Sequence, residues 1–362
     1  MSMRKTRLGI VGAGTMGRLH LDKFSSLPEV QLAAVADSSA ARRESAQADY
    51  NISAGYSDGA KLIAEADVDG VVIAVPNRLH APLAIAALRA GRHVLLEKPM
   101  ATSSTEARDI LEAERASGCK LLIGHHMRWA WPYSAIKQQV DAGEFGKIYY
   151  VKAGWFRRKG IPAWGSTYTS KTHMGGGAAF DIGVHMLDLA LHLVGGVRAV
   201  SVFGAAYSKI GTQRLGLGSW GERNMAGSFD VDDLAAAMVR LEDSTVINLE
   251  VSWAAHTDAE ANSPYLHLMG DAGGVSIRNM SGRWMIERFD NSVDIDLQQP
   301  ESMIDERAGL ARHFVDCITS GAPSLVSGRS GYVNSAILEA LYRSSETGME
   351  IRDFLDQDLA GT

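Results

Sequence analysis

The chain has 362 residues, of which 46% are hydrophobic and 22% charged, a globular composition at a length that suits about two domains. Its formal net charge is -6, and no basic run is longer than a pair such as Arg42-Arg43, which argues against nucleic-acid binding. No stretch reaches the ~18 apolar residues that span a bilayer, and Cys119 and Cys317 form no CxxC pair. We therefore expect a cytoplasmic, metal-free protein with a small-molecule partner.

Short apolar runs alternate with helix-like segments over residues 7–124. Two of these segments, His80 to Ala90 and Ser104 to Ser117, are each followed by a glycine, as helices often are. Ser103 and Glu106 have the spacing of a capping box. The alternation predicts an α/β domain with a doubly wound parallel sheet. Its predicted strands are Leu8–Val11, Leu32–Ala36, Val71–Val75, Val94–Leu96 and Leu121–Ile123.

Aromatic and β-branched residues gather in longer runs after about residue 125, which predicts a second domain with a mainly antiparallel sheet. These runs are Ile148–Phe156, Val197–Tyr207, Ala235–Trp253 and Trp284–Phe289. The segment from Ala178 to Val194 is apolar almost all round, so we expect a buried helix there. A last helix is expected over about Ser330 to Thr347. Two glycine-rich stretches, Lys159 to Gly177 and Gly211 to Gly227, are interpreted as binding loops or disordered excursions.

A glycine-rich turn, GAGTMG, follows the first predicted strand and precedes a helix. Gly12 would allow the tight turn, Gly14 the close approach of a pyrophosphate, and Gly17 the packing of the helix on the strand. The helix would present its first N–H groups, at Thr15 and Met16, to the phosphates. This context predicts a dinucleotide-binding domain, and the alternative is an ordinary glycine-containing loop.

The end of the second predicted strand indicates which dinucleotide is bound. Asp37 lies 20 residues after Gly17, where a carboxylate accepts hydrogen bonds from ribose hydroxyls and repels a 2′-phosphate, so NAD is expected. Ser38, Arg42 and Arg43 follow closely and leave NADP as an alternative.

Two further strand ends lie at the same sheet edge. Pro76, Asn77 and His80 are expected to contact the ribose or nicotinamide, although Pro76-Asn77 is also read as a simple turn. Glu97 and Lys98 follow the predicted strand Val94–Leu96, and we place both at the cofactor. A lysine there reaches the nicotinamide and a substrate hydroxyl and stabilises a developing alkoxide, unless it is only a solvated strand end.

Four polar residues interrupt the otherwise apolar segment Ala178–Val194. Asp181, His185, Asp188 and His192 are spaced by 4, 3 and 4 residues, which places them on one face of an α-helix. Such a stripe is either a narrow solvent face or the wall of a site. A histidine suits general base catalysis, and a carboxylate one turn away can orient it.

Three motifs, in this order, resemble those of the Gfo/Idh/MocA oxidoreductases. They are the glycine turn at 12–17, Glu97-Lys98-Pro99, and Gly175-Gly176-Gly177 followed by Asp181-Ile182-Gly183-Val184-His185. The resemblance covers nearly the whole chain. It implies catalytic roles for Asp181 and His185, because the matching aspartate and histidine are catalytic in the family.

The resemblance also implies a division into domains. Residues 1–125 would form a Rossmann domain, and residues 126–330 an α+β domain with a large, mainly antiparallel open sheet for substrate binding and oligomerisation. Residues 331–362 would hold a helix that packs back toward the N-terminal domain. Because this sheet commonly forms the oligomer interface in the family, a homodimer or homotetramer is expected.

The predicted reaction is hydride transfer between nicotinamide and a secondary alcohol or ketone of a sugar, polyol or inositol. In it, the substrate lies between the nicotinamide and the helix, His185 removes the hydroxyl proton and Lys98 steadies the alkoxide. Asp181 binds a neighbouring hydroxyl or tunes His185. The alternatives are a glycosidase that oxidises its substrate transiently, reduction of an imine or another unsaturated carbon, and a non-catalytic dinucleotide-responsive regulator. The expected substrate lining comprises Arg128, Trp155, Arg157, Arg158, Trp164, Tyr168 and Lys171.

Overall fold

The computed structural model describes residues 4–258, 263–300, 305–356 and 359. The chain forms two compact units, Met1–Trp129 with Ile304–Tyr332, and Ala130–Met303 with Val333–Thr362. The division differs from the sequence-based boundaries because residues 304–330 join the first unit. The reason is the packing of helix α9 (Glu306–Ser320), whose Phe314 meets Phe24 edge to face at 6.2 Å between ring centroids.

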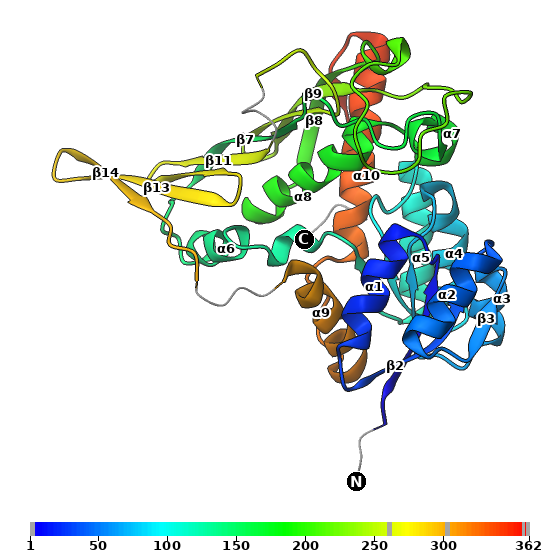
Figure 1. Ribbon diagram of the computed structural model, residues 1–362. Coiled ribbons are helices and arrows are strands. Elements are labelled where there is room, and N and C mark those ends of the chain that lie inside the picture. The colour runs from blue at the N-terminus through cyan, green and yellow to red at the C-terminus, as the bar shows by residue number, and fades with distance from the viewer. Residues whose placement is uncertain (1–3, 259–262, 301–304, 357–358, 360–362) are drawn as a thin grey trace. The chain divides into compact units, whose positions relative to one another are not determined.

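The first unit contains a parallel sheet flanked by helices (Figure 1). In the described part of the chain its strand order is β3-β2-β1-β4-β5-β6. This order confirms the doubly wound fold, in which ligands bind at the carboxyl ends of the strands near the switch between β1 and β4. The strands are β1 (Thr6–Val11), β2 (Val30–Ala36), β3 (Ala54–Tyr56), β4 (Gly70–Ile73), β5 (His93–Leu96) and β6 (Leu121–Ile123). The helices are α1 (Thr15–Ser25), α2 (Ala40–Tyr50), α3 (Gly59–Glu65), α4 (His80–Arg89), α5 (Ser104–Ser117) and α9, with short turns η1 (Asn77–Leu79) and η2 (His126–Trp129).

Helix α5 begins and ends where the sequence predicts. Ser103 accepts a hydrogen bond from the Glu106 N–H at 3.2 Å, which is half of a capping box. The other half differs, because the Glu106 carboxylate accepts from the N–H and hydroxyl of Thr102 at 3.0 and 2.6 Å. The Glu106 side chain therefore accepts from Thr102, the residue before the cap, instead of from the N–H of Ser103.

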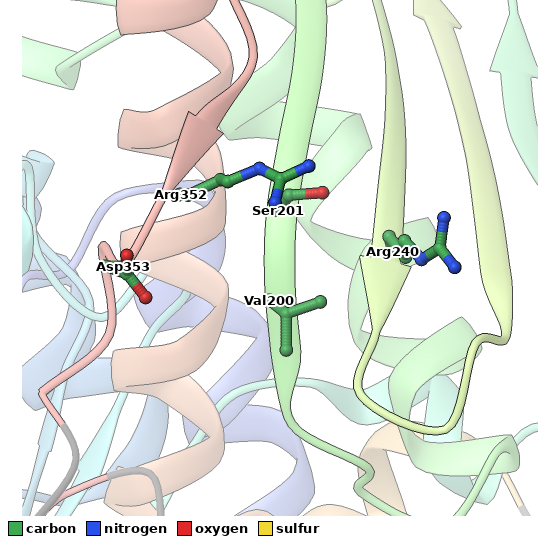
Figure 2. Close-up of a pocket in the computed structure, with 5 residues that line it drawn as sticks. All are labelled: Val200, Ser201, Arg240, Arg352 and Asp353. Carbon is green, nitrogen blue, oxygen red and sulfur yellow. The ribbon is translucent and has the colours of Figure 1, made fainter.

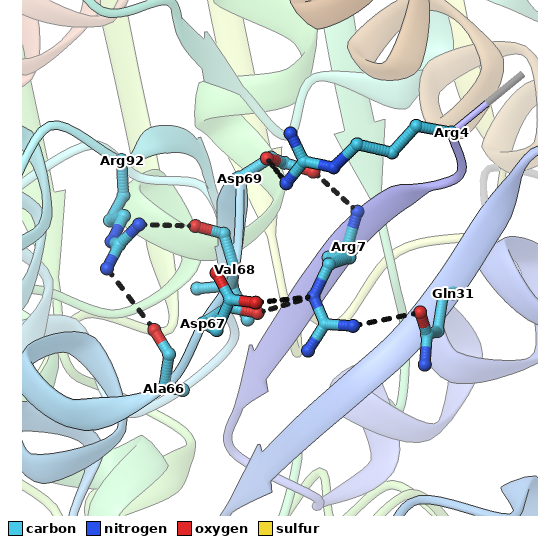
Figure 3. A network of polar contacts seen from close by, with 8 residues as sticks. All are labelled: Arg4, Arg7, Gln31, Ala66, Asp67, Val68, Asp69 and Arg92. Atoms are coloured by element: carbon cyan, nitrogen blue, oxygen red, sulfur yellow. Dashed lines mark hydrogen bonds and ion pairs between the residues drawn. The ribbon is translucent and has the colours of Figure 1, made fainter.

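The amino edge of this sheet is closed by hydrogen bonds between side chains and main chain (Figure 3). The Arg7 N–H donates to Asp69 at 2.8 Å, and the Arg7 guanidinium donates to the Asp67 carbonyl at 2.8 Å. Arg92 donates to the carbonyl of Val68 at 2.6 Å. These bonds fix the start of β1 beside the loop that precedes β4, at the end of the sheet opposite to the glycine turn.

The second unit contains an open sheet with the order β14-β13-β12-β11-β7-β10-β9-β8-β15 among the described residues (Figure 1). Within it only β7 and β10 pair in parallel, so the predicted, mainly antiparallel sheet is confirmed. The strands are β7 (Ile148–Phe156), β8 (Ala199–Tyr207), β9 (Leu234–Leu241), β10 (Val246–Ser252), β11 (Pro264–Gly270), β12 (Gly274–Arg278), β13 (Ser281–Arg288), β14 (Asn291–Asp296) and β15 (Ile351–Arg352).

The predicted buried helix consists of a π-helical turn, η4 (Ala179–Gly183), followed by α8 (Val184–Leu193). Met186, Leu187 and Leu189 have 0% exposure, as expected for a helix that is buried all round, and α8 packs on β7, β10 and β11. The remaining helices of the described chain are α6 (Tyr133–Asp141), α7 (Lys171–Met174) and α10 (Gly328–Thr347), with short turns η3 (Thr167–Thr169) and η5 (Gly211–Gln213). No described helix combines the length and apolar character needed to cross a membrane.

The two long glycine-rich stretches pair with each other through their main chains. Ile161 and Leu217 form a parallel bridge, and the Ala163 N–H donates to the Trp220 carbonyl at 2.8 Å. At the start of the second stretch, Asp233 accepts from the N–H groups of Ile210 and Gly211 at 2.6 and 2.8 Å. The two stretches thus form one ordered layer whose position is set by Asp233.

Glu114 in α5 predicts a pH dependence of the stability. Burial raises the pKa of Glu114 to about 7, against the lowering effect of a hydrogen bond from the Leu121 N–H. Between pH 4.5, its ordinary pKa, and about 7, the folded chain holds a proton that the unfolded chain has released, so the free energy of unfolding falls as pH rises through this window. Above pH 7 this contribution is lost.

We expect Glu114→Gln to stabilise the protein at pH 8 by about 1 to 3 kcal/mol and to have little effect at pH 4.5. Urea unfolding at both pH values measures the difference. Glu112→Gln, an exposed change on the same helix, is the control and should have no effect at either pH. An equal effect of Glu114→Gln at both pH values would contradict the assignment.

Candidate active site

The glycine turn between β1 and α1 has two crowded positions and one open position. Gly12 has φ +97°, and a Cβ there would lie 2.2 Å from the Ala74 carbonyl oxygen. A Cβ on Gly17 would lie 1.8 Å from the Gly12 carbonyl oxygen, whereas at Gly14 the nearest atom is in the Arg42 guanidinium, 4.0 Å away. Gly14 also begins α1 without a side-chain cap. The turn therefore fits a pyrophosphate, because the approach at Gly14 is clear and the first N–H groups of α1 have no side-chain acceptor.

The carboxylate of Asp37 is fixed beside this turn. It accepts hydrogen bonds from the N–H groups of Ala13 and Ser39, each at 2.8 Å. Arg43 donates to the Asp37 carbonyl at 2.9 Å and is therefore turned toward the main chain. Arg42 is exposed next to Gly14. Of the two arginines, it is therefore the one whose side chain could contact a bound dinucleotide.

His80 does not have the position expected of a cofactor ligand. It is 0% exposed, with Nδ1 2.8 Å from the Pro99 carbonyl oxygen and Nε2 3.0 Å from the Val75 carbonyl oxygen. Burial lowers the pKa of His80. We therefore withdraw it from the cofactor contacts, because the ring joins the end of β4 to the segment after Lys98.

Asn77, also expected at the cofactor, is 4% exposed at the start of η1, directly after Pro76.

Glu97 supports Lys98 from inside the protein. Its Oε1 lies 2.8 Å from His20 Nε2, both side chains being about 5% exposed, and its Oε2 accepts from the Lys98 N–H at 3.2 Å. Burial alone would raise the pKa of Glu97, but the hydrogen bond with His20 and the charges of Lys98 and Arg307 lower it to about 2. Glu97 is therefore a permanent buried anion at the strand end, and we withdraw it as a cofactor ligand.

The lysine itself is half-buried in cationic surroundings. Burial and, next, the charge of Arg307 lower the pKa of His126 to about 3, so this histidine is neutral. The positive charges of Lys98 and Arg307 act on both Glu97 and His126. Lys98 thus lies at the carboxyl end of β5, where its main-chain N–H donates to the buried carboxylate of Glu97.

Asp232 holds the start of the π-helical turn in the second unit. It accepts from the N–H groups of Gly177 and Ala179 at 2.7 and 3.0 Å, and the hydroxyl of Tyr342 donates to it. A Cβ on Gly177 would lie 1.9 Å from the Asp232 carbonyl oxygen, so the third glycine of the motif is needed for close packing. Burial raises the pKa of Asp232, and these hydrogen bonds oppose the rise. Neither Asp232 nor Tyr342 was identified from the sequence.

The four polar residues of this segment do not form a single stripe. Asp181 lies in the π turn, whose hydrogen bonds run from i to i+5, so its offset from His185 differs from that in an α-helix. Asp188 is 1% exposed and accepts from the Asn334 amide at 3.0 Å, which makes it a structural residue. His185 is 7% exposed, and the half-buried Asp181 accepts from Trp253 Nε1 at 2.9 Å.

The carboxyl ends of β7 and β10 bring two more side chains to Asp181. The strands run parallel with Trp155 opposite Val251, so both end at the same edge of the sheet. Arg157 follows β7, and its guanidinium carbon lies 4.5 Å from the centroid of the Trp155 ring. Burial lowers the pKa of Arg157, and the charge of Asp181 opposes this. Of the predicted lining residues, Arg157 is the one on which the charge of Asp181 acts, and Trp155 packs against Arg157.

Two other residues of the expected substrate lining, Arg128 and Trp164, are buried with structural partners instead, and we withdraw them. Arg128 is 7% exposed and donates to the Leu325 carbonyl at 2.6 Å. Trp164 is 3% exposed and donates to the Gly211 carbonyl at 2.9 Å inside the loop layer. Lys171 is exposed and pairs with Glu346 at 3.8 Å. Of the remaining two, Tyr168 packs edge to face on Trp220 at 4.7 Å, and Arg158 is exposed.

A hollow of about 470 Å³ lies elsewhere, at the β15 edge of the open sheet (Figure 2). Arg352 and Ser201 pair across β15 and β8, and Arg240 pairs with Ser201 on the next strand. Hydrogen bonds from Ser201 and Arg352 lower the pKa of Glu350, which lies beside this row. The hollow contains no predicted catalytic residue, so we do not place the active site there.

The glycine geometry predicts different effects for two alanine substitutions. Gly17→Ala should lower the melting temperature and abolish NADH binding, because its Cβ meets the main chain. Gly14→Ala should melt like the wild type but bind NADH roughly tenfold or more weakly, because its methyl group occupies the open approach. Thermal melting and NADH fluorescence titration measure the two properties. Equal NADH affinity of Gly14→Ala and the wild type would contradict the assigned phosphate position.

Comparisons with known proteins match both parts of the chain. Residues 6–125 match the oxidoreductase family with an NAD-binding Rossmann fold, and residues 133–276 match the GFO/IDH/MocA C-terminal domain. The chain is 29% identical over 353 residues to D-glucoside 3-dehydrogenase of Escherichia coli (strain K12), covering 97% of this chain and 98% of the relative. It is 31% identical over 276 residues, 75% of each chain, to a putative UDP-kanosamine synthase oxidoreductase subunit of Amycolatopsis mediterranei (strain S699).

Solved structures share the fold. A levoglucosan dehydrogenase in complex with NADH superposes with a TM-score of 0.85, at 22% identity, over 96% of this chain and 99% of that one. A further relative, the scyllo-inositol 2-dehydrogenase (NAD(+)) of Bacillus subtilis (strain 168), is 24% identical over 96% of both chains. The chain therefore belongs to the Gfo/Idh/MocA family and is an NAD-dependent dehydrogenase.

Proposed function

We propose that the protein oxidises a secondary alcohol of a glycoside, sugar or inositol, or reduces the corresponding ketone. The similarity to D-glucoside 3-dehydrogenase, which extends over 97% of this chain, carries the substrate class. The relatives named as inositol dehydrogenases support the same chemistry on a cyclic polyol. Aromatic rings beside hydrogen-bonding groups, as at Trp155 and Asp181, suit a hydroxylated ring.

NAD, when bound, supplies the hydride acceptor. In this proposal His185 accepts the proton of the substrate hydroxyl, and Lys98 donates a hydrogen bond to the oxygen as it becomes an alkoxide. Glu97 and His20 hold the main chain of Lys98 at the end of β5. Gly14 and the first turn of α1, with Thr15 and Met16, would hold the pyrophosphate.

We further propose a preference for NAD over NADP. Both oxygens of Asp37 are held by main-chain N–H groups, so the carboxylate stays beside the ribose position and would repel a 2′-phosphate. Arg42 and Ser38 are exposed nearby and would contact the adenosine end of the cofactor.

The test is to incubate the purified protein with NAD and a panel of alkyl and aryl glucosides, free sugars and inositols, and to follow NADH absorbance. We expect NADH to accumulate with at least one compound. Release of aglycone without net NADH would favour the glycosidase, and NADH binding without turnover of any compound would favour a regulator. Lys98→Met should abolish turnover and retain NADH binding, whereas the exposed Lys61→Met should behave as wild type. An active Lys98→Met variant would refute the role of this lysine.

We also propose that a second copy of the chain covers the exposed face of the open sheet. Phe203, Met238 and Met285 are 54%, 50% and 36% exposed. The register places Phe203 opposite Met238, and the alternation of side chains continues the same face to Met285 on β13. Large apolar residues gathered on one face indicate an interaction surface.

Met238→Glu should shift the protein toward a monomer because it buries a charge in this interface. Sedimentation velocity or light scattering measures the mass. Met225→Glu, an exposed change in the loop layer, should leave the mass unchanged. A Met238→Glu variant with the same mass as the wild type would exclude this face as the interface.

A further inference from the structure

Arg157 is held in place from several directions. Its guanidinium lies over the Trp155 ring at 4.5 Å, and the main-chain N–H of Arg157 donates to the Ser252 carbonyl at 2.9 Å. A Cβ on Gly160 would lie 2.5 Å from Arg157 Cδ, so the chain passes close along the stem of the side chain. Such a side chain loses little further conformational entropy when it binds a ligand.

The guanidinium of Arg157 carries N–H donors on all three of its nitrogens. Among the described residues, no oxygen accepts a hydrogen bond from them, although the residue is half-buried and burial lowers its pKa. A guanidinium offers five N–H donors in a fixed plane, and hydrogen bonds from a charged donor are among the stronger ones. This arrangement is typical of a recognition residue.

Asp181 supplies the complementary acceptor. Its negative charge acts on Arg157, and Trp253 Nε1 fixes its Oδ2 at 2.9 Å. Trp253 is 0% exposed, so this support is rigid. The charges of Arg157 and Asp181 are opposite and cancel, and an anionic ligand at Arg157 would meet the repulsion of Asp181.

We propose that Arg157 and Asp181 together bind two neighbouring hydroxyl groups of an uncharged sugar ring. Arg157 donates to the oxygen of one hydroxyl, and Asp181 accepts from the other. The inference rests on the proposed function and goes beyond it, because it names the recognised group and makes Arg157 a determinant of specificity for neutral over acidic sugars.

The experiment compares Arg157→Met with the wild type on a methyl glucoside, its monodeoxy analogues and the corresponding glucuronide. We expect kcat/KM for the methyl glucoside to fall about 10- to 100-fold, the effect of one hydrogen bond from a charged donor. One deoxy analogue, which lacks the bonded hydroxyl, should react equally with both proteins. The wild type should prefer the glucoside to the glucuronide.

Arg214→Met is the matched control, since this exposed arginine also lies over an indole ring, that of Trp164, at 5.5 Å. It should retain wild-type kcat/KM for every compound, and both variants should bind NADH and melt as the wild type does. An Arg157→Met variant with unchanged kcat/KM on all compounds would refute the inference and leave the proposed function standing. A wild-type preference for the glucuronide that Arg157→Met removes would instead show carboxylate recognition and overturn it. A wild type inert on the whole panel overturns the proposed function, and this inference with it.

Discussion

Two adjacent buried carboxylates, Asp232 and Asp233, determine the position of the chemistry in the second unit. Asp232 binds the N–H groups where the glycine motif becomes the π turn, and Asp233 binds those at the start of the second glycine-rich stretch. Asp233 also accepts, through its carbonyl, the N–H of Trp253 at 2.8 Å. Because Trp253 in turn holds Asp181, a single short segment before β9 fixes the candidate catalytic carboxylate from both sides.

The first unit uses buried polar groups in a comparable way. His80 was expected at the cofactor, but the structure uses it, and also His20, as internal supports. A buried carboxylate such as Glu97 is tolerated only when it is paired and hydrogen-bonded, and His20 provides this partner. Lys98 is therefore held at its position by groups that do not themselves reach the ligand.

The sequence was sufficient for the features that depend on local pattern. The apolar runs, the glycine turn and the boundaries of α5 follow from neighbouring residues, and the structure agrees with them. The partners of Asp232 and Asp188 could not be found in this way, because Tyr342 and Asn334 lie more than 100 residues further along the chain. The helical periodicity also assumed an uninterrupted α-helix, and no local signal marked the π turn that separates Asp181 from the rest.

Several of the buried polar candidates have structural partners. Arg128, Trp164 and Asp188 are among the most buried, and each has a partner within its own unit. Such residues resemble binding residues in sequence because both kinds carry polar atoms.

The parallel pairing of β7 with β10 is the one departure from antiparallel order in the described sheet, and it has a functional consequence. In an antiparallel pair the two chains would leave the sheet at opposite edges. Here Trp155 and Arg157 leave at the same edge as Trp253, which holds Asp181. The topology of two strands therefore brings the proposed specificity residue to the candidate catalytic carboxylate, although Arg157 and Trp253 are far apart in sequence. Variation in the loop after β7 would alter recognition while the support of Asp181 from β10 is preserved.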